Sequence, residues 1–217
     1  MKYLPLLLVL FIACQETDKP FLKQEKNQVW SVKEVDGEHT KDQVTFLETY
    51  EYDEAGNEIG HLLYSPTGEL SGKELAVFDD EYEQPIGTRY YTPEDSLLSY
   101  YSLKYDDNGQ KTSRWGFDAT NDELLRMENF KYDKKGNMIQ KDILSADNQL
   151  QSSFIFTYDA YGNKTSLNIK DPKGETLLTE TYKITKFDDQ KRWVENWGWR
   201  DDKPYSFRVR ELVYEEK

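Results

Sequence analysis

The sequence is poor in the residues that form disulfides, metal sites and nucleic-acid surfaces. It has one cysteine and two histidines among 217 residues, so no second cysteine is available for a disulfide, and a zinc site would lack ligands. The formal charge is −13, which argues against nucleic acid as a partner, because such binding needs basic residues that displace phosphate counterions. The same charge opposes an electrostatic grip on anionic lipid.

Long apolar runs are also lacking, apart from one at the start. Leu4 to Ile12 is apolar except for Pro5, which is too short for a mature membrane-spanning helix but typical of a signal peptide. We therefore expect residues 1–13 to be a signal peptide. We expect residues 14–28, which are polar, to be a flexible tether, and residues 29–217 to form a single β-repeat domain.

The end of this apolar run, "FIAC" at residues 11–14, resembles the lipobox of bacterial lipoproteins, although the family usually has leucine where Phe11 stands. The resemblance implies that Cys14 becomes the mature N-terminus and carries acyl chains such as palmitate. Each methylene buried in a bilayer contributes about 0.8 kcal/mol to attachment. The expected location is the bacterial outer membrane, with the protein periplasmic or surface-exposed. The alternative is an ordinary secreted protein.

An aromatic residue followed by an aspartate occurs six times at nearly constant spacing. The intervals between the aspartates are 26, 27, 27, 26 and 29 residues, which predicts a repeat architecture. The six aspartates are Asp53, Asp79, Asp106, Asp133, Asp159 and Asp188. In four copies a glycine follows at the fourth turn position, namely Gly56, Gly109, Gly136 and Gly162. Aspartate caps a turn and glycine supplies a positive φ, so the motif predicts a hairpin turn.

A second turn lies midway through each repeat. These turns are "SPTGEL" (65–70), "TPEDSL" (92–97), "DATNDEL" (118–124), "SADNQL" (145–150) and "DPKGETL" (171–177). The stretches between turns alternate with period two and show no long helical stripe. We therefore predict an all-β fold, an antiparallel meander of about a dozen strands built from two-strand repeats. It would be a twisted single sheet or a partly closed barrel or shell. An open sheet would have edges near residues 28–36 and 205–214.

The phrases "YDEAGN", "YDDNGQ", "YDKKGN" and "YDAYGN" resemble the YD repeat of the Rhs and teneurin-type proteins, over roughly residues 45–215. The resemblance implies an array of β-hairpins that coils or closes, on a secreted or surface-anchored protein. In Rhs proteins the array encapsulates a toxin. This chain has six copies rather than dozens, and it replaces the family's arginine after the turn glycine by Asn57, Gln110, Asn137 and Asn163. We expect only the hairpin architecture to carry over.

Candidate chemistry is sparse. His39 and His61 lie in unrelated contexts, and no nucleophile motif or phosphate-binding loop is present. Acidic pairs such as Asp106-Asp107 and Asp188-Asp189 fit turn capping best. Calcium binding is an alternative, because Ca²⁺ takes oxygen ligands from loops, and glycoside hydrolysis by paired acids is a further one. We expect no catalytic residue, no bound metal and no cofactor.

Tryptophans gather near the C-terminal end. Trp193, Trp197 and Trp199 alternate within "WVENWGW", so period two predicts that all three share one strand face. Trp115 and Trp197 each follow a turn aspartate by nine residues, which suggests one column. Such a face can stack on sugars or anchor a protein partner. Alternatively, the tryptophans plug the end of the array, since terminal repeats are often atypical.

The resulting hypothesis is a non-enzymatic surface or periplasmic lipoprotein that serves as a binding scaffold for a protein or glycan. A membrane-anchored immunity or antitoxin-like protein is the alternative among interaction proteins. A glycan hydrolase is the enzyme alternative and ranks last.

Overall fold

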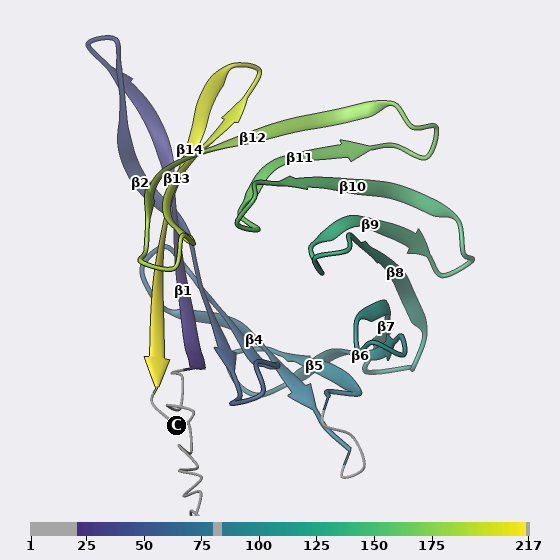
Figure 1. The fold of residues 1–217 in the computed structure, drawn as a ribbon. Coiled ribbons are helices and arrows are strands. Elements are labelled where there is room, and N and C mark those ends of the chain that lie inside the picture. Colours follow the sequence, from purple (N-terminus) through teal and green to yellow (C-terminus); the bar gives the residue numbers. More distant parts are fainter. Residues whose placement is uncertain (1–20, 80–83, 216–217) are drawn as a thin grey trace, which may run out of the picture.

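The computed structural model describes residues 21–79 and 84–215, which fold into β-strands joined by short turns (Figure 1). The strands are β1 (Phe21–Val35), β2 (Glu38–Tyr52), β3 (Glu58–Tyr64), β4 (Leu70–Val77), β5 (Gly87–Tyr91), β6 (Leu97–Tyr105), β7 (Lys111–Asp118), β8 (Leu124–Tyr132), β9 (Met138–Ser145), β10 (Leu150–Tyr158), β11 (Lys164–Lys170), β12 (Thr176–Phe187), β13 (Trp193–Arg200) and β14 (Lys203–Glu215).

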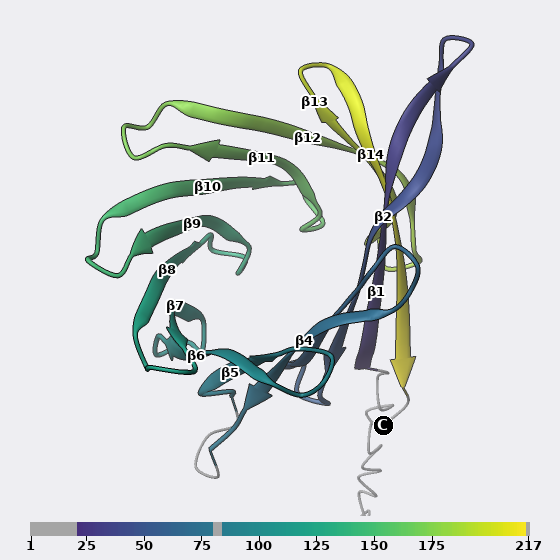
Figure 2. The same cartoon turned by 180° about the vertical axis from the view of Figure 1, so that it is seen from behind.

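The strands form a closed antiparallel barrel. Each strand pairs with its neighbours in the chain, and β14 pairs with β1 to complete the circle. The strands curl around a central axis, and β1, β2 and β14 form one wall (Figures 1 and 2). The all-β antiparallel meander is confirmed, with fourteen strands rather than about a dozen, and of the two forms left open by the sequence the barrel is the one observed. Closure pairs the two segments that would be edges in an open sheet, from Phe21 with Glu215 to Ser31 with Ser206.

The expectation of a flexible tether is wrong for residues 21–28. They belong to β1 and are hydrogen-bonded between β2 and β14. The polar composition misled the prediction, because the inner face of this barrel is itself polar: Glu25 forms an ion pair with Arg210 at 3.5 Å. The predicted signal peptide, Cys14 and residues 14–20 lie outside the described residues.

The turn aspartates act as the motif predicts. Asp159 Oδ1 accepts hydrogen bonds from the backbone amides of Tyr161 and Asn163, both at 2.9 Å, and its Oδ2 accepts one from the Asn163 side chain at 2.9 Å. Gly162 has a φ of 84° and donates its amide to the Asp159 carbonyl. The same amide-to-carboxylate bonds occur at Asp106, Asp133, Asp171 and Asp188. The second copy runs from Asp79 into residues 80–83, which lie outside the described residues.

The aromatic residue before each of three turn aspartates connects successive hairpins. Its phenol hydroxyl donates to a backbone carbonyl of the preceding hairpin or loop. The three bonds run from Tyr105 to Pro85, from Tyr132 to Lys111 and from Tyr158 to Met138, at 2.8, 2.9 and 2.7 Å. Burial raises the pKa of all three phenols, so they remain donors at neutral pH.

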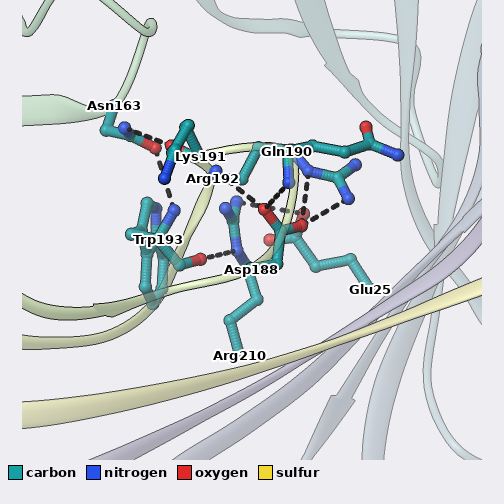
Figure 3. Close-up of polar contacts among 8 residues, drawn as sticks. All are labelled: Glu25, Asn163, Asp188, Gln190, Lys191, Arg192, Trp193 and Arg210. Atoms are coloured by element: carbon teal, nitrogen blue, oxygen red, sulfur yellow. Dashed lines mark hydrogen bonds and ion pairs between the residues drawn. The ribbon is translucent and has the colours of Figure 1, made fainter.

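The asparagine after the turn glycine links one turn to the next. Asn163 is 4% exposed. Its Nδ2 donates to the Lys191 carbonyl at 3.0 Å, and its Oδ1 accepts from the Trp193 amide at 2.9 Å (Figure 3). Gln84 makes the equivalent contact to Gly109 at 3.0 Å. These amide side chains therefore hold neighbouring turns together along one rim, and Asn163 does so from the position where the YD-repeat family has arginine.

The barrel has little apolar core. Among the described residues, Met127, Phe156 and Phe207 are the buried hydrophobic side chains, at 9%, 7% and 4% exposed. The buried polar side chains are more numerous: Thr49, Ser99, Ser113, Glu128, Asn163, Glu180, Asn196 and Ser206. Hydrogen bonds of the turns and between hairpins therefore supply much of the specificity that an apolar core supplies in most domains.

Turn conformation predicts opposite effects of two substitutions. Gly162→Ala should lower the free energy of unfolding by about 1–2 kcal/mol, because alanine is strained at positive φ. A Cβ there would also lie 3.2 Å from Asn137 Oδ1. Lys191→Gly should raise it by about 1 kcal/mol, because Lys191 has a φ of 63° in the last copy.

Urea unfolding followed by far-UV circular dichroism measures both changes, with Lys173→Gly in a neighbouring turn as the control for a lysine-to-glycine substitution. Stabilisation by Gly162→Ala would contradict the turn assignment.

Candidate functional site

A polar concavity lies on the inner side of the barrel. A cavity of about 450 Å³ is lined by residues of β2, β3, β4, β5, β6 and β7 together with the loops between them. Side chains from so many successive strands of a curled sheet converge only on its concave face. They are Tyr50, Asn57, Glu58, His61, Glu74, Gln84, Pro85, Thr88, Leu103, Tyr105, Gly109, Lys111 and Arg114. We call the space inside the barrel the lumen.

Two fixed clusters form the walls of this cavity. Arg114 Nη2 lies 2.5 Å from Glu74 Oε1, although the two residues are three strands apart, and Thr88 also donates to Glu74. On the other wall, His61 Nε2 lies 3.0 Å from Glu48 Oε2, and the His61 ring stacks on Tyr50 at 4.2 Å. These contacts lock the aromatic and carboxylate groups into place before any ligand arrives.

Glu58 and Lys111 are two charged side chains of the cavity whose pKa values are shifted by burial. Desolvation is the main cause of the raised pKa of Glu58, which nearby His61 and Lys111 oppose. Desolvation also lowers the pKa of Lys111, and Arg114 lowers it further by repulsion. Glu58 is nevertheless open to water within the lumen. Among the described residues neither group forms an ion pair shorter than 4.0 Å.

Glu58 and Lys111 occupy one repeat position, which sequence reasoning did not single out. Each lies five residues after a turn aspartate and pairs with the motif aromatic across the hairpin. The residues at this position are Glu58, Lys111, Met138, Lys164 and Trp193. The turn residues recur while this inward-facing position varies, and that contrast is the signal that could have located the lumen site.

The predicted tryptophan face divides between the two sides of the sheet. Trp193 lines a lumen pocket with Lys164 and Arg208, whereas Trp197 and Trp199 line a separate pocket with Lys183. The expectation that all three share one face is wrong, because the strand register shifts between Glu195 and Trp193. A bulge of this kind turns the following side chain to the opposite face.

The other expectation, that Trp115 and Trp197 fall at one position of the stacked repeats, stays a prediction. Trp115 is in β7 and Trp197 is in β13, nearly opposite in the circle of strands. Lys104 lies 4.3 Å above the Trp115 ring. Trp197 packs edge-on against Phe207 at 4.9 Å, and Phe207 is the register partner of Trp30. Trp197 thus packs where the last strands meet the first.

The acidic turns do not gather into a metal centre in the part of the chain that the structure describes, where no group of three or more His, Cys, Asp or Glu side chains could hold an ion. Their oxygens already accept turn amides, as at Asp106 and Asp188. The hydrogen bond from the Asn137 side chain, with turn amides, lowers the pKa of Asp133. Calcium would have to compete with these donors.

Comparisons with known proteins give distant likenesses. No protein-family model and no curated protein matches the chain. A porin-like protein from Bacteroides uniformis is 14% identical, with a TM-score of 0.48, over 89% of this chain and 98% of that one. An outer membrane lipoprotein-sorting protein domain from Vibrio parahaemolyticus is 13% identical, with a TM-score of 0.36, over 89% and 86% of the two chains.

A third likeness is to TcdB2-TccC3, at 18% identity and a TM-score of 0.36. It covers 79% of this chain but 10% of that one, so this chain spans about a tenth of that protein. At such identities and TM-scores these likenesses assign neither a family nor a function. Membership of the YD-repeat family therefore stays a prediction from the turn motif. Among residues 21–79 and 84–215, no helix is long and apolar enough to cross a membrane.

The position of Trp197 predicts a structural role. Trp197→Ala should lower the free energy of unfolding by about 2–3 kcal/mol, because it removes the ring that packs against Phe207. Trp197→Phe should recover part of this loss. Urea unfolding measures both variants. If Trp197→Ala leaves stability unchanged, the ring is free to serve as a binding face instead.

Proposed function

We propose that the protein is a non-enzymatic envelope lipoprotein whose barrel binds a glycan-sized polar ligand in the lumen. The observation that carries the proposal is the 450 Å³ cavity. Charged and aromatic side chains from six strands converge on it. Its volume lies in the range of about 300–1,000 Å³ that is usual for ligand sites. No cofactor or metal is proposed for this activity.

The arrangement of the cavity fits a ligand-binding role better than a purely structural one. A carboxylate and an ammonium without close partners face a space that is also walled by the Tyr50–His61 stack. Aromatic faces are suited to sugar rings, and charged groups orient polar substituents. Glu74 and Arg114 form an ion pair with one another, although the buried Nε of Arg114 has no hydrogen-bond partner. They shape the cavity while Glu58 and Lys111 remain available.

The lumen site predicts a specific loss of binding. Titration calorimetry of the mature protein with a panel of neutral and acidic oligosaccharides should identify a ligand. Against that ligand, Glu58→Gln and Lys111→Met should each weaken binding about tenfold, since a hydrogen bond to a charged group contributes about 1.5–3 kcal/mol. Glu175→Gln and Lys131→Met, at exposed positions, are the matched controls and should bind as the wild type does.

Other outcomes of this experiment decide between the alternatives. Binding that survives both lumen substitutions would overturn the lumen site. Release of a cleaved product, lost in Glu58→Gln, would replace the proposal by the glycan-hydrolase alternative, in which Glu58 with its raised pKa is the acid. A protein that binds no oligosaccharide but captures a purified toxin encoded by the neighbouring gene would favour the immunity alternative.

The lipid anchor is proposed from the lipobox resemblance, with the bacterial outer membrane as the location. Wild-type protein expressed with its signal peptide should incorporate labelled palmitate and fractionate with membranes. Cys14→Ser should lose the label and move to the soluble fraction, because an acyl chain supplies the attachment. Equal membrane association of the Cys14→Ser variant would contradict the anchor while leaving the lumen site untouched.

A further inference from the structure

The lumen contains more cations than its carboxylates neutralise. Each arginine of the inner face takes a glutamate as partner. The pairs are Arg114–Glu74 at 2.5 Å, Arg126–Glu128 at 3.0 Å, Arg200–Glu180 at 2.5 Å, Arg208–Glu180 at 3.9 Å and Arg210–Glu25 at 3.5 Å, so Glu180 serves two arginines. Glu48 is occupied by His61 and by the Tyr50 hydroxyl, both at 3.0 Å. These five glutamates are thus occupied, whereas Glu58, which lines the same cavity as Lys111, is in no ion pair among the described residues.

Three lysines of the lumen are left without a carboxylate. Lys111, Lys141 and Lys164 each place the ammonium over a phenylalanine ring, at 5.2, 4.6 and 4.7 Å. Within the described residues, none of the three takes part in an ion pair. The attraction of a cation to an aromatic face offsets only part of the desolvation of an ammonium.

These lysines also repel other cations of the lumen. Desolvation is the largest cause of the lowered pKa of Lys164, followed by repulsion from Arg208 and Lys141. Desolvation likewise lowers the pKa of Lys141; Glu128 acts against this shift, and repulsion from Arg126 and Arg114 adds to it. Unpaired, partly buried positive charges lower stability. A bound anion would supply the negative charge that this row of lysines lacks.

One end of the lysine row is a small formed pocket. Lys164, Tyr182, Trp193, Asn196 and Arg208 surround a cavity of about 60 Å³, several times the space that one water molecule needs. The buried Nε of Arg208 has no hydrogen-bond partner. Asn196 is 4% exposed, and its Oδ1 also lacks a partner. Of these two atoms only the Arg208 Nε is a donor, so it, beside the Lys164 ammonium, is the capacity that an oxyanion can use.

We propose that the lumen binds an anionic ligand, with one oxyanion group seated between Lys164 and Arg208 and further negative charge along Lys141 and Lys111. The inference deepens the proposed function, on which it rests, by assigning the charge of the ligand. Carboxylate, sulfate and phosphate groups share the required chemistry, because all present oxygen acceptors to ammonium and guanidinium donors.

The acidity of the whole chain makes the lumen selective. The chain carries a formal charge of −13, yet the lysine row is a region of positive charge inside it. A multiply charged anion is repelled by the outside of the barrel, so it gains affinity only where the lumen cations surround it. Nonspecific binding of anions to the outer surface is therefore disfavoured.

Calorimetry with the mature protein and three probes tests the inference. The probes are tripolyphosphate, trigalacturonate and neutral maltotriose, so phosphate and carboxylate sources are separated. Wild type should bind at least one of the two anions. Lys164→Met and Lys141→Met should each weaken that binding about tenfold, and Lys131→Met, an exposed lysine of β8, should leave it unchanged.

Thermal unfolding without ligand supplies an independent readout. Lys164→Met should raise the melting temperature, because it replaces an unpaired cation by an apolar side chain, whereas Lys131→Met should not. The anion that binds should raise the melting temperature of wild type more than that of Lys164→Met. If Lys164→Met fails to fold by circular dichroism, Lys141→Met carries the same comparison.

Several results would overturn the inference. Equal anion affinity of Lys164→Met, Lys141→Met and Lys131→Met would remove the lysine row as the site. Binding of maltotriose with no binding of either anion would also reject it, while leaving the proposed lumen function in place. Absence of binding by all three probes and by the wider oligosaccharide panel would reject both together.

Discussion

The barrel depends on the hydrogen bonds that the turn aspartate accepts. In the fifth copy, the two carboxylate oxygens of Asp159 hold two backbone amides and one side-chain amide. The closed turn fixes the strand register, and the register directs Tyr158 inward to the preceding hairpin. Asn163 then reaches to the next turn. One carboxylate thus organises a hairpin and both of its neighbours, in a fold with few buried apolar side chains.

Such a scaffold leaves the inner face free of the usual task of apolar packing. The residues that hold the hairpins together lie at the rim, at the turns and the motif aromatics. Side chains deeper in the lumen can therefore be charged without unfolding the barrel, provided that each has a partner or access to water. The Arg114–Glu74 pair, which joins β7 to β4, shows that these charges also brace the wall across several strands.

The sequence was sufficient to predict the hairpins, because each turn is encoded within a few residues by aspartate and glycine. It predicted closure only as one option, since closure depends on β1 pairing with β14 across the whole length of the chain. The predicted polar tether was wrong for a related reason: residues 21–28 form a strand because they pair with β2 and with the distant β14, where Arg210 is the ion-pair partner of Glu25. The side occupied by Trp193 depends on a bulge, and no local residue pattern marked that bulge.

The sequence did not reveal the candidate site, because its residues stand at a regular position of the repeat rather than at a break in it. A search for breaks leads to the tryptophans near the C-terminal end, of which Trp197 packs at the closing seam. The inward position five residues after each turn aspartate is regular in place but variable in chemistry, with Glu58, Lys111 and Lys164 among its members. Residues that hold a repeat together must recur, whereas those that recognise a ligand need to differ around the ring. Variation at a constant position of the lumen is therefore the pattern expected of an asymmetric, charged ligand.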